Sequence, residues 1–406
     1  MRINRKQLLL TLVLLAALMP LRAQFLYWDY VDMVTDTVQS GAYSDMKIGN
    51  NGTIHISYWQ RVEDKLVYAW RSTNDTLWHR EYVEPTHQNG FRSSICLDAA
   101  GTPHIAYYEN VSGQVAVRYA KRLGPSNWLV ENLPDIHGRG YGDYGPVGTI
   151  SSKERIQHSL ELIFDENNKP QIAFFDGWMD INAFPGCTSS SDYGFKLHQG
   201  IRVNSEWLVR SLGHVHDLHQ SCNPYPLRDT LPMGDRYGEY LDMLMEPDGT
   251  IDIFSLSRFN NEITRHRTLF PFVDTVWTKT PVDSLKRITI QVFGAFTRFF
   301  TFEGISATRS NDGYTHLAYT TSVFYGDNFF YIDSSALAYT RISPSGAISY
   351  KEFPPGTYRN YTDIVTNGGA DSVFVLYADI SNLYFVLASS ADSGSTWQSD
   401  TLLNGI

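Results

Sequence analysis

The sequence contains few cysteines, no excess of basic residues and one apolar run that is too short to cross a membrane. Three of the 406 residues are cysteine, so a disulfide framework does not define the fold. The formal net charge of −10 argues against nucleic acid or an anionic lipid surface as a partner, because a negative protein attracts neither. Long helical periodicity is also missing. The sequence therefore predicts neither a helical nor a nucleic-acid-binding protein.

The first 23 residues have the features of a secretory signal peptide. Basic residues precede an apolar run over residues 8–19, and the small residue Ala23 follows it. The run has 12 residues, whereas a membrane-spanning helix needs about 20. We therefore expect cleavage after Ala23 and an exported protein that is periplasmic, cell-surface or secreted. The mature chain, residues 24–406, is then expected to be a single domain with a formal charge of about −14 and no membrane span.

The cysteines have different expected roles. Cys187 and Cys222 both lie in Gly-, Ser-, Pro- or Asn-containing sequence that is predicted to form long loops. In an exported protein such a pair can oxidise, so we expect a disulfide between them. Cys96 lies inside a predicted strand and is expected to be a small buried apolar residue.

A seven-residue pattern recurs along the chain. It reads GTIHISY at 52–58, GTPHIAY at 101–107 and GYTHLAY at 313–319, with looser copies that start at residues 169, 249 and 372. Each copy follows an alternating stretch and a short polar turn, such as Asn50-Asn51-Gly52. Two alternating stretches joined by such a turn indicate a tight β-hairpin.

Two more strands follow each hairpin. The third has alternating aromatic residues, and the fourth opens on a tryptophan in five of the six units: Trp78, Trp128, Trp207, Trp277 and Trp397. The fifth unit has Ile348 and Tyr350 in this region instead. An aromatic content of 14% suits half-buried strands.

The repeat predicts an all-β propeller. Units of four antiparallel strands that recur every 49 to 81 residues fit a propeller better than a sandwich. We expect six four-stranded blades, with five or seven as the alternatives. The expected blades span residues 41–89, 90–135, 155–213, 234–285, 300–355 and 357–406.

The last unit carries a distinctive turn motif. Residues 390–397 read SADSGSTW, in which Asp392 can accept turn amides, Gly394 permits a positive φ and Trp397 can pack into the blade. On this motif the chain resembles the Asp-box (BNR-repeat), sialidase-like β-propeller superfamily. The resemblance implies the fold. It leaves the activity open, because the superfamily includes lectins and scaffolds as well as enzymes.

Alignment of the units by their turn glycines places six polar residues at one position of the first strand: Asp45, Ser94, Glu161, Asp242, Ser306 and Asp363. In a propeller the first strands line the central channel. A ring of oxygen atoms there would bind a ligand or attract Ca²⁺, which prefers oxygen ligands. The alternative is that these side chains cap amides of the neighbouring blades and hold the blades in register.

Two sets of histidines also stand out. One set shares a position on the second strand, where a hydrogen-bonded strut is expected: His55, His104 and His316. The other set lies close together in sequence and suggests a transition-metal site, with an ordinary polar loop as the alternative: His214, His216 and His219.

Long aromatic and polar loops are expected to carry specificity. The three candidates are residues 135–146, which include Tyr141 and Tyr144, residues 176–193 and residues 293–302. Tyrosine, tryptophan and arginine in such loops suit sugar recognition, and they equally suit a protein interface.

An enzyme remains an alternative. Sialidases of the superfamily use an arginine triad, an acid/base aspartate and a Tyr–Glu nucleophile pair; the resemblance implies these roles for Arg92, Arg236 and Arg359, for Asp45, and for Tyr361 with Glu239. The Phe-Arg-Ile-Pro motif of that family is missing, and residues 91–94 read FRSS. A polysaccharide lyase would instead use a histidine and a tyrosine, with His137 or His158 and Tyr141 or Tyr144 as candidates.

A complete blade pattern without a complete catalytic set favours a non-catalytic recognition propeller. We expect a monomer that binds a glycan or an envelope protein through one channel mouth and its long loops. The alternatives are a glycan-cleaving enzyme, of the glycoside hydrolase or polysaccharide lyase kind, and a structural component of a cell-surface assembly.

Overall fold

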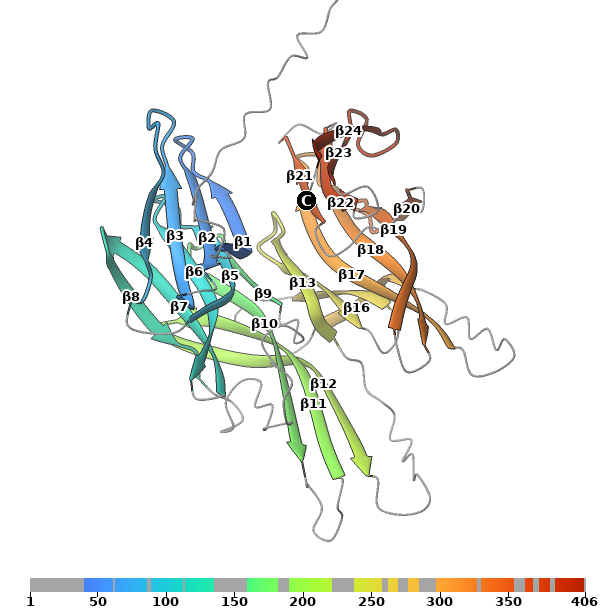
Figure 1. Ribbon diagram of the computed structural model, residues 1–406, viewed down its shortest axis with the longest axis horizontal. Helices are drawn as coiled ribbons and strands as arrows, with labels where there is room; N and C mark the ends of the chain where they lie inside the picture. Colours follow the sequence, from blue (N-terminus) through green and yellow to red (C-terminus); the bar gives the residue numbers. More distant parts are fainter. Residues whose placement is uncertain are drawn as a thin grey trace, which may run out of the picture. The chain divides into compact units, whose positions relative to one another are not determined.

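The computed structural model describes residues 40–60, 63–85, 89–111, 114–134, 159–181, 190–220, 237–257, 262–268, 277–284, 297–326, 330–353, 362–367, 372–379 and 384–404. These residues form six four-stranded antiparallel sheets, arranged as the blades of a β-propeller (Figure 1). The predicted fold class and blade number are therefore confirmed. None of the described segments is a helix that is long and apolar enough to span a membrane.

The first three blades contain strands β1 to β12. Blade 1 has β1 (Ser40–Ile48), β2 (Ile54–Gln60), β3 (Lys65–Arg71) and β4 (His79–Tyr82). Blade 2 has β5 (Asn89–Leu97), β6 (Pro103–Val111), β7 (Gln114–Gly124) and β8 (Asn127–Asn132). Blade 3 has β9 (Leu160–Phe164), β10 (Pro170–Ile181), β11 (Ser190–Val203) and β12 (Glu206–Gln220).

The last three blades contain strands β13 to β24. Blade 4 has β13 (Tyr237–Met245), β14 (Ile251–Ser257), β15 (Glu262–Thr268) and β16 (Trp277–Ser284). Blade 5 has β17 (Thr297–Arg309), β18 (Thr315–Gly326), β19 (Phe330–Ile342) and β20 (Ile348–Glu352). Blade 6 has β21 (Asp363–Thr366), β22 (Val373–Asp379), β23 (Tyr384–Ser390) and β24 (Gln398–Asn404).

The recurring histidines form the predicted struts inside the blades. Nδ1 of His55 lies 2.7 Å from the hydroxyl of Tyr68, and Nδ1 of His316 lies 2.7 Å from the hydroxyl of Tyr339. His104 makes the same contact with Tyr119. Burial lowers the pKa of His316 to about 4, so the ring is neutral at pH 7 and acts as a hydrogen-bonding spacer between two strands.

The same tyrosines join one blade to the next. The ring of Tyr68 in blade 1 meets the edge of Trp128 in blade 2 at 5.4 Å between centroids. The equivalent contacts are Tyr119 with Trp207 at 5.1 Å and Tyr339 with Trp397 at 4.9 Å. Edge-to-face aromatic pairs of this kind add stability beyond the apolar area they bury. The tryptophan that opens the fourth strand is therefore a wedge between blades.

The turn predicted at residues 390–397 is present at the end of β23. Asp392 accepts the amide of Thr396 through Oδ1 at 2.7 Å and the hydroxyl of Thr396 through Oδ2 at 2.7 Å. Gly394 has a φ of +85°, and the indole of Trp397 donates to its carbonyl at 2.9 Å. The turn thus presents Trp397 to Tyr339 of the preceding blade.

Two stretches that were predicted to be loops are partly strands. Most of the segment over residues 176–193 belongs to β10 and β11, and residues 297–302 of the third predicted loop belong to β17. The loop interpretation was wrong here because the aromatic and polar residues continue the alternation of the blade, with β10 and β11 paired as far as Ile181 and Ser191. Cys187 and Cys222 lie outside the described residues, so their disulfide stays a prediction.

Candidate functional site

The six polar residues that share one register position lie on the innermost strand of their blades. β1, β5, β9, β13, β17 and β21 follow one another in contact around the propeller. Each carries one member of the set, which we call the axial ring: Asp45, Ser94, Glu161, Asp242, Ser306 and Asp363. The alignment by turn glycines therefore brought residues from six distant parts of the sequence to one zone of the fold.

The axial ring connects the blades by a repeated hydrogen bond. In each case a ring side chain accepts the backbone amide of the residue that follows the ring position in the next blade. The four bonds are Ile95 N to Asp45 Oδ2 at 2.8 Å, Leu162 N to Ser94 Oγ at 3.1 Å, Ala307 N to Asp242 Oδ2 at 2.6 Å, and Ile364 N to Ser306 Oγ at 3.3 Å. For these four members of the ring, this confirms the capping interpretation, in which the side chains hold successive blades in register.

Lys47 places a positive charge next to the ring. It lies two residues after Asp45 on β1 and therefore on the same face of the strand. Its Nζ lies 3.6 Å from Oδ1 of Asp45 and 4.0 Å from Oε1 of Glu161. Its side chain is 39% exposed. Burial opposes the charge, but Asp45, Glu161, Cys96 and Asp242 together raise the pKa of Lys47.

Two ring carboxyl groups are harder to ionise than usual. Burial raises the pKa of Glu161 well above its ordinary value, with the charges of Asp242 and Asp45 acting in the same direction against Lys47. Burial likewise raises the pKa of Asp242 to about 7, although the amide of Ala307 and the charge of Lys47 oppose the shift. Glu161 and Asp242 therefore keep their protons to a higher pH than ordinary carboxyl groups do, and a protonated carboxyl group can donate a hydrogen bond as well as accept one.

The raised pKa of Asp242 predicts a specific pH dependence of stability. A carboxyl group whose pKa is near 7 when folded and 3.8 when unfolded favours folding at low pH, and this contribution is lost as the pH rises from about 4 to 7. Urea unfolding of the natural protein and of Asp242→Asn should show that the variant loses up to about 2 kcal/mol less stability between pH 5 and pH 8.

A turn aspartate provides the control for this measurement. Hydrogen bonds from Thr102 and His104 lower the pKa of Asp98 despite its burial, so it stays ionised in both states between pH 5 and pH 8. Asp98→Asn should leave the pH slope unchanged. An equal slope in the natural protein and in Asp242→Asn would show that Asp242 does not titrate in this range.

Most of the residues proposed for catalysis lie outside the described part of the chain. Arg92 is described on β5, where its φ is +51°. The residues that lie outside are Arg236, Arg359, Tyr361, Tyr141, Tyr144, His137 and His158. Glu239 belongs to β13, but its side chain lies outside. The sialidase-like set and the lyase set therefore stay predictions.

The histidine cluster proposed for a metal lies within a strand. His214, His216 and His219 belong to β12, which pairs with β11 as far as Gln220, and not to a loop that turns back. Their side chains lie outside the described residues, so this metal site stays a prediction. Among the residues that are described, no group of three or more His, Cys, Asp or Glu is placed to hold a metal ion. The calcium site at the ring also stays a prediction.

The sequence analysis missed Lys47, and it placed Cys96 in a strand without noticing that it lies beside the ring. Lys47 and Cys96 occupy equivalent places, two residues after Asp45 and Ser94. Burial raises the pKa of the Cys96 thiol to about 11, so it is protonated at neutral pH, and Cys96 packs against a hydrophobic core cluster that includes Leu162. The signal that could have found both is the two-residue period of a strand, applied to the ring position.

Comparisons with known proteins show the fold. No family model and no curated protein matches the chain. Among solved structures, the polysaccharide lyase Uly1 is similar over 89% of this chain and 81% of its own, with 10% identity and a TM-score of 0.50. A protein of unknown function from Dyadobacter fermentans is similar over 90% of this chain and 94% of its own, with 11% identity and a TM-score of 0.48. The GH93 α-L-arabinofuranosidase of Fusarium graminearum is similar over 77% and 81%, with 11% identity and a TM-score of 0.39. At these identities the likeness to Uly1 shows a shared propeller fold.

Proposed function

We propose that this chain is an exported carbohydrate-binding propeller that holds its ligand against the axial ring and Lys47. The observation that carries the proposal is the mixture of groups there: carboxyl groups, two of which have raised pKa values, serine hydroxyls and the ammonium group of Lys47 beside two of the carboxyl groups. The side chains of Asp45 and Glu161 are 23% and 19% exposed, so they lie within reach of solvent. A sugar, which presents several hydroxyl groups that both donate and accept, suits such a surface.

Binding without catalysis fits the ring better than hydrolysis does. Asp45 and Asp242 each accept an amide of the next blade, so the fold fixes these carboxyl groups and uses part of their capacity as acceptors. The polysaccharide lyase Uly1 shares this fold, which supports a carbohydrate as the ligand class. The aspartate-containing turn of residues 390–397 supports a place in the Asp-box superfamily, which includes lectins.

The proposal is tested by glycan binding and by product analysis. The purified protein is applied to a glycan array, and the best oligosaccharide is then titrated against the natural protein and against Glu161→Gln. Since this variant keeps the shape of the side chain and removes its charge and its acidic proton, we expect weaker binding by about tenfold. Glu166→Gln, at an exposed turn position, is the matched control and should bind like the natural protein. The proposal fails when no glycan binds or when both variants bind equally well.

A glycan-cleaving enzyme is a second candidate, and the pKa of Asp242 favours it. A carboxyl group with a pKa of about 7 is protonated often enough near neutral pH to act as a general acid, the role that one of two carboxyl groups plays in glycoside hydrolysis. Incubation with the bound oligosaccharide distinguishes the two functions. Shorter products that disappear in Asp242→Asn identify an enzyme, whereas an intact oligosaccharide identifies a binding protein.

A further inference from the structure

The junction between blades 4 and 5 differs from the other blade junctions. In blades 1, 2 and 5 the junction tyrosine pairs with the second-strand residue that lies two places after the strut histidine; these tyrosines are Tyr68, Tyr119 and Tyr339. In blade 4 the residue at the same register position is Arg265. Ile348 occupies the position of the wedge tryptophan in blade 5, and it is 44% exposed. Both partners of the Tyr–Trp contact are therefore replaced at this one junction.

Charged residues also replace the strut and an apolar neighbour there. Asp252 occupies the position of His55 and His104, and it is fully buried. Arg309 occupies the position at the end of the first strand where blades 2 and 3 have Leu97 and Phe164. At this junction three charged residues and Ile348 thus occupy the positions of the aromatic contact, the strut and an apolar neighbour.

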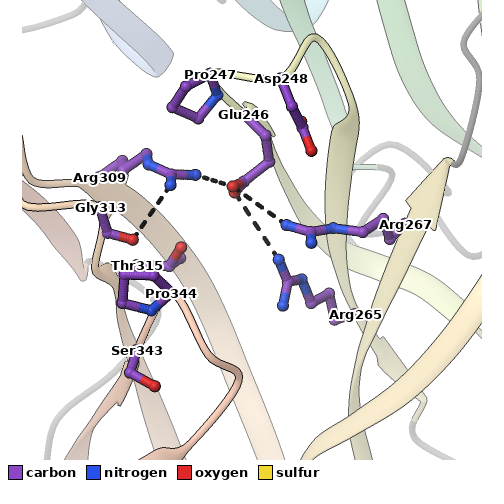
Figure 2. A pocket seen from close by; sticks show the side chains of 10 residues that line it. All are labelled: Glu246, Pro247, Asp248, Arg265, Arg267, Arg309, Gly313, Thr315, Ser343 and Pro344. Carbon is purple, nitrogen blue, oxygen red and sulfur yellow. Dashed lines mark hydrogen bonds and ion pairs between the residues drawn. The ribbon is translucent and has the colours of Figure 1, made fainter.

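The changes leave a pocket of about 270 Å³ between the two blades. Figure 2 shows Arg265 and Arg267 of β15 and Arg309 of β17 pointing toward the carboxylate of Glu246. Oε2 of Glu246 lies 3.2 Å from Nη2 of Arg267 and also pairs with Arg309, while its Oε1 lies 3.9 Å from Nη2 of Arg265. Thr315 and Ser343 also line this space.

Each of the three guanidinium groups has one nitrogen whose N–H groups are not used as hydrogen-bond donors within the described residues. Arg265 and Arg267 each bind Asp252 through Nε and Nη2, and Arg309 donates through Nη1 to Glu246 and through Nη2 to the carbonyl of Gly313. Among the described residues, Nη1 of Arg265, Nη1 of Arg267 and Nε of Arg309 donate to no acceptor. Oε1 of Glu246 is itself buried without a hydrogen-bond partner in the described part of the chain. Within the described residues, Oε1 of Glu246 is therefore held by an ion pair with Arg265 and by no hydrogen bond.

We propose that this pocket binds a small oxyanion, a carboxylate or sulfate group carried by a ligand, which takes the place that the Glu246 carboxylate now occupies. The planar fork of an arginine matches a carboxylate or sulfate with two parallel hydrogen bonds, and three such forks converge here. A purely structural ion network would not need a cavity beside it. The volume suits one small group. The site lies at a blade junction, apart from the axial ring, and does not depend on the proposed function.

The test is a calorimetric titration of the purified protein with sodium glucuronate, sodium sulfate and, as the neutral comparison, glucose. We expect saturable binding of one or both anions that weakens with added salt, and no binding of glucose to the pocket. A preference for glucuronate identifies an acidic sugar as the ligand, and equal affinity identifies a free inorganic anion.

Two variants with opposite expected effects test the site. Arg309→Met, which restores an apolar residue like those in the other blades, should weaken binding by about tenfold or more because a charge-assisted contact is lost. Glu246→Gln should strengthen binding several-fold because the competing carboxylate is removed. Arg202→Met breaks the Arg202–Glu131 ion pair between blades 2 and 3 and should leave the affinity unchanged.

These outcomes distinguish a binding site from an ion network. If neither anion binds, or if Glu246→Gln binds no more tightly than the natural protein, the ion pairs serve only to join the blades and the proposal is overturned. Since Glu246→Gln is expected to gain affinity, loss of stability in Arg309→Met does not obscure the result.

Discussion

Substitution of Tyr68 by alanine is expected to destabilise the protein by about 3–5 kcal/mol, the usual cost of deleting a large buried aromatic side chain. Tyr68 is 1% exposed, and its ring contacts Trp70 within the blade and Trp128 in the next one. Loss of the ring therefore opens a cavity at the junction between two blades. Chemical denaturation of the natural protein and of Tyr68→Ala measures the difference.

Tyr68→Phe separates the packing from the hydrogen bond. The ring stays in place, but Nδ1 of His55 loses the hydroxyl that lies 2.7 Å away, so we expect a loss of about 1–2 kcal/mol. Equal losses of stability in Tyr68→Phe and Tyr68→Ala would mean that the hydrogen bond to His55, and not the packing of the ring against Trp128, stabilises the junction.

Substitution of Lys47 by methionine is expected to cost about 1–3 kcal/mol. Removal of one partner of a buried ion pair leaves the other charges uncompensated, at a typical cost of about 3–5 kcal/mol. Because the Lys47 side chain is 39% exposed, solvent screening reduces this figure. The carboxyl groups of Asp45 and Glu161 would then lie near one another without the ammonium group that now contacts both.

A double substitution checks that the loss arises from this charge. Adding Glu161→Gln to Lys47→Met removes one of the uncompensated acids, so the double variant should regain part of the lost stability. A control at Lys351→Met, on the outer strand β20 where the ammonium lies 5.7 Å from the ring centre of Phe353, should change stability by less than about 1 kcal/mol. Equal losses of stability in Lys47→Met and Lys351→Met would show that the charge of Lys47 beside the axial ring contributes nothing special to stability.

The fold could be predicted from the sequence because its information is local and repeated. The hairpin glycines and the fourth-strand tryptophans recur in most units, and the strut histidines recur in three of the six. Each repeats a contact that one blade makes with itself or with the next. The alignment by Gly52 and its equivalents also placed the axial ring. The capping role of Asp45 followed from that repetition, since a position that recurs in every unit tends to serve the repeat itself.

The parts that could not be predicted depend on single blades. Lys47 occurs at its position in blade 1 alone, so no repetition pointed to it. To predict the pocket between blades 4 and 5, one must know that Arg265 takes the place of a tyrosine. This becomes clear only when the strand register is known. One sign of this difference is visible in the sequence, since Ile348 stands where the other five units have a tryptophan. The strands of blade 3 that include His214 were mistaken for loops because their alternation is polar as well as aromatic.

A crystal structure of the protein with its best array oligosaccharide tests the central proposal most directly. The proposal predicts sugar hydroxyls within hydrogen-bonding distance of Glu161 and of the Lys47 ammonium, with the ring-to-amide bonds between blades retained. Sugar bound elsewhere on the propeller, with the space beside Lys47 filled by water alone, would contradict it.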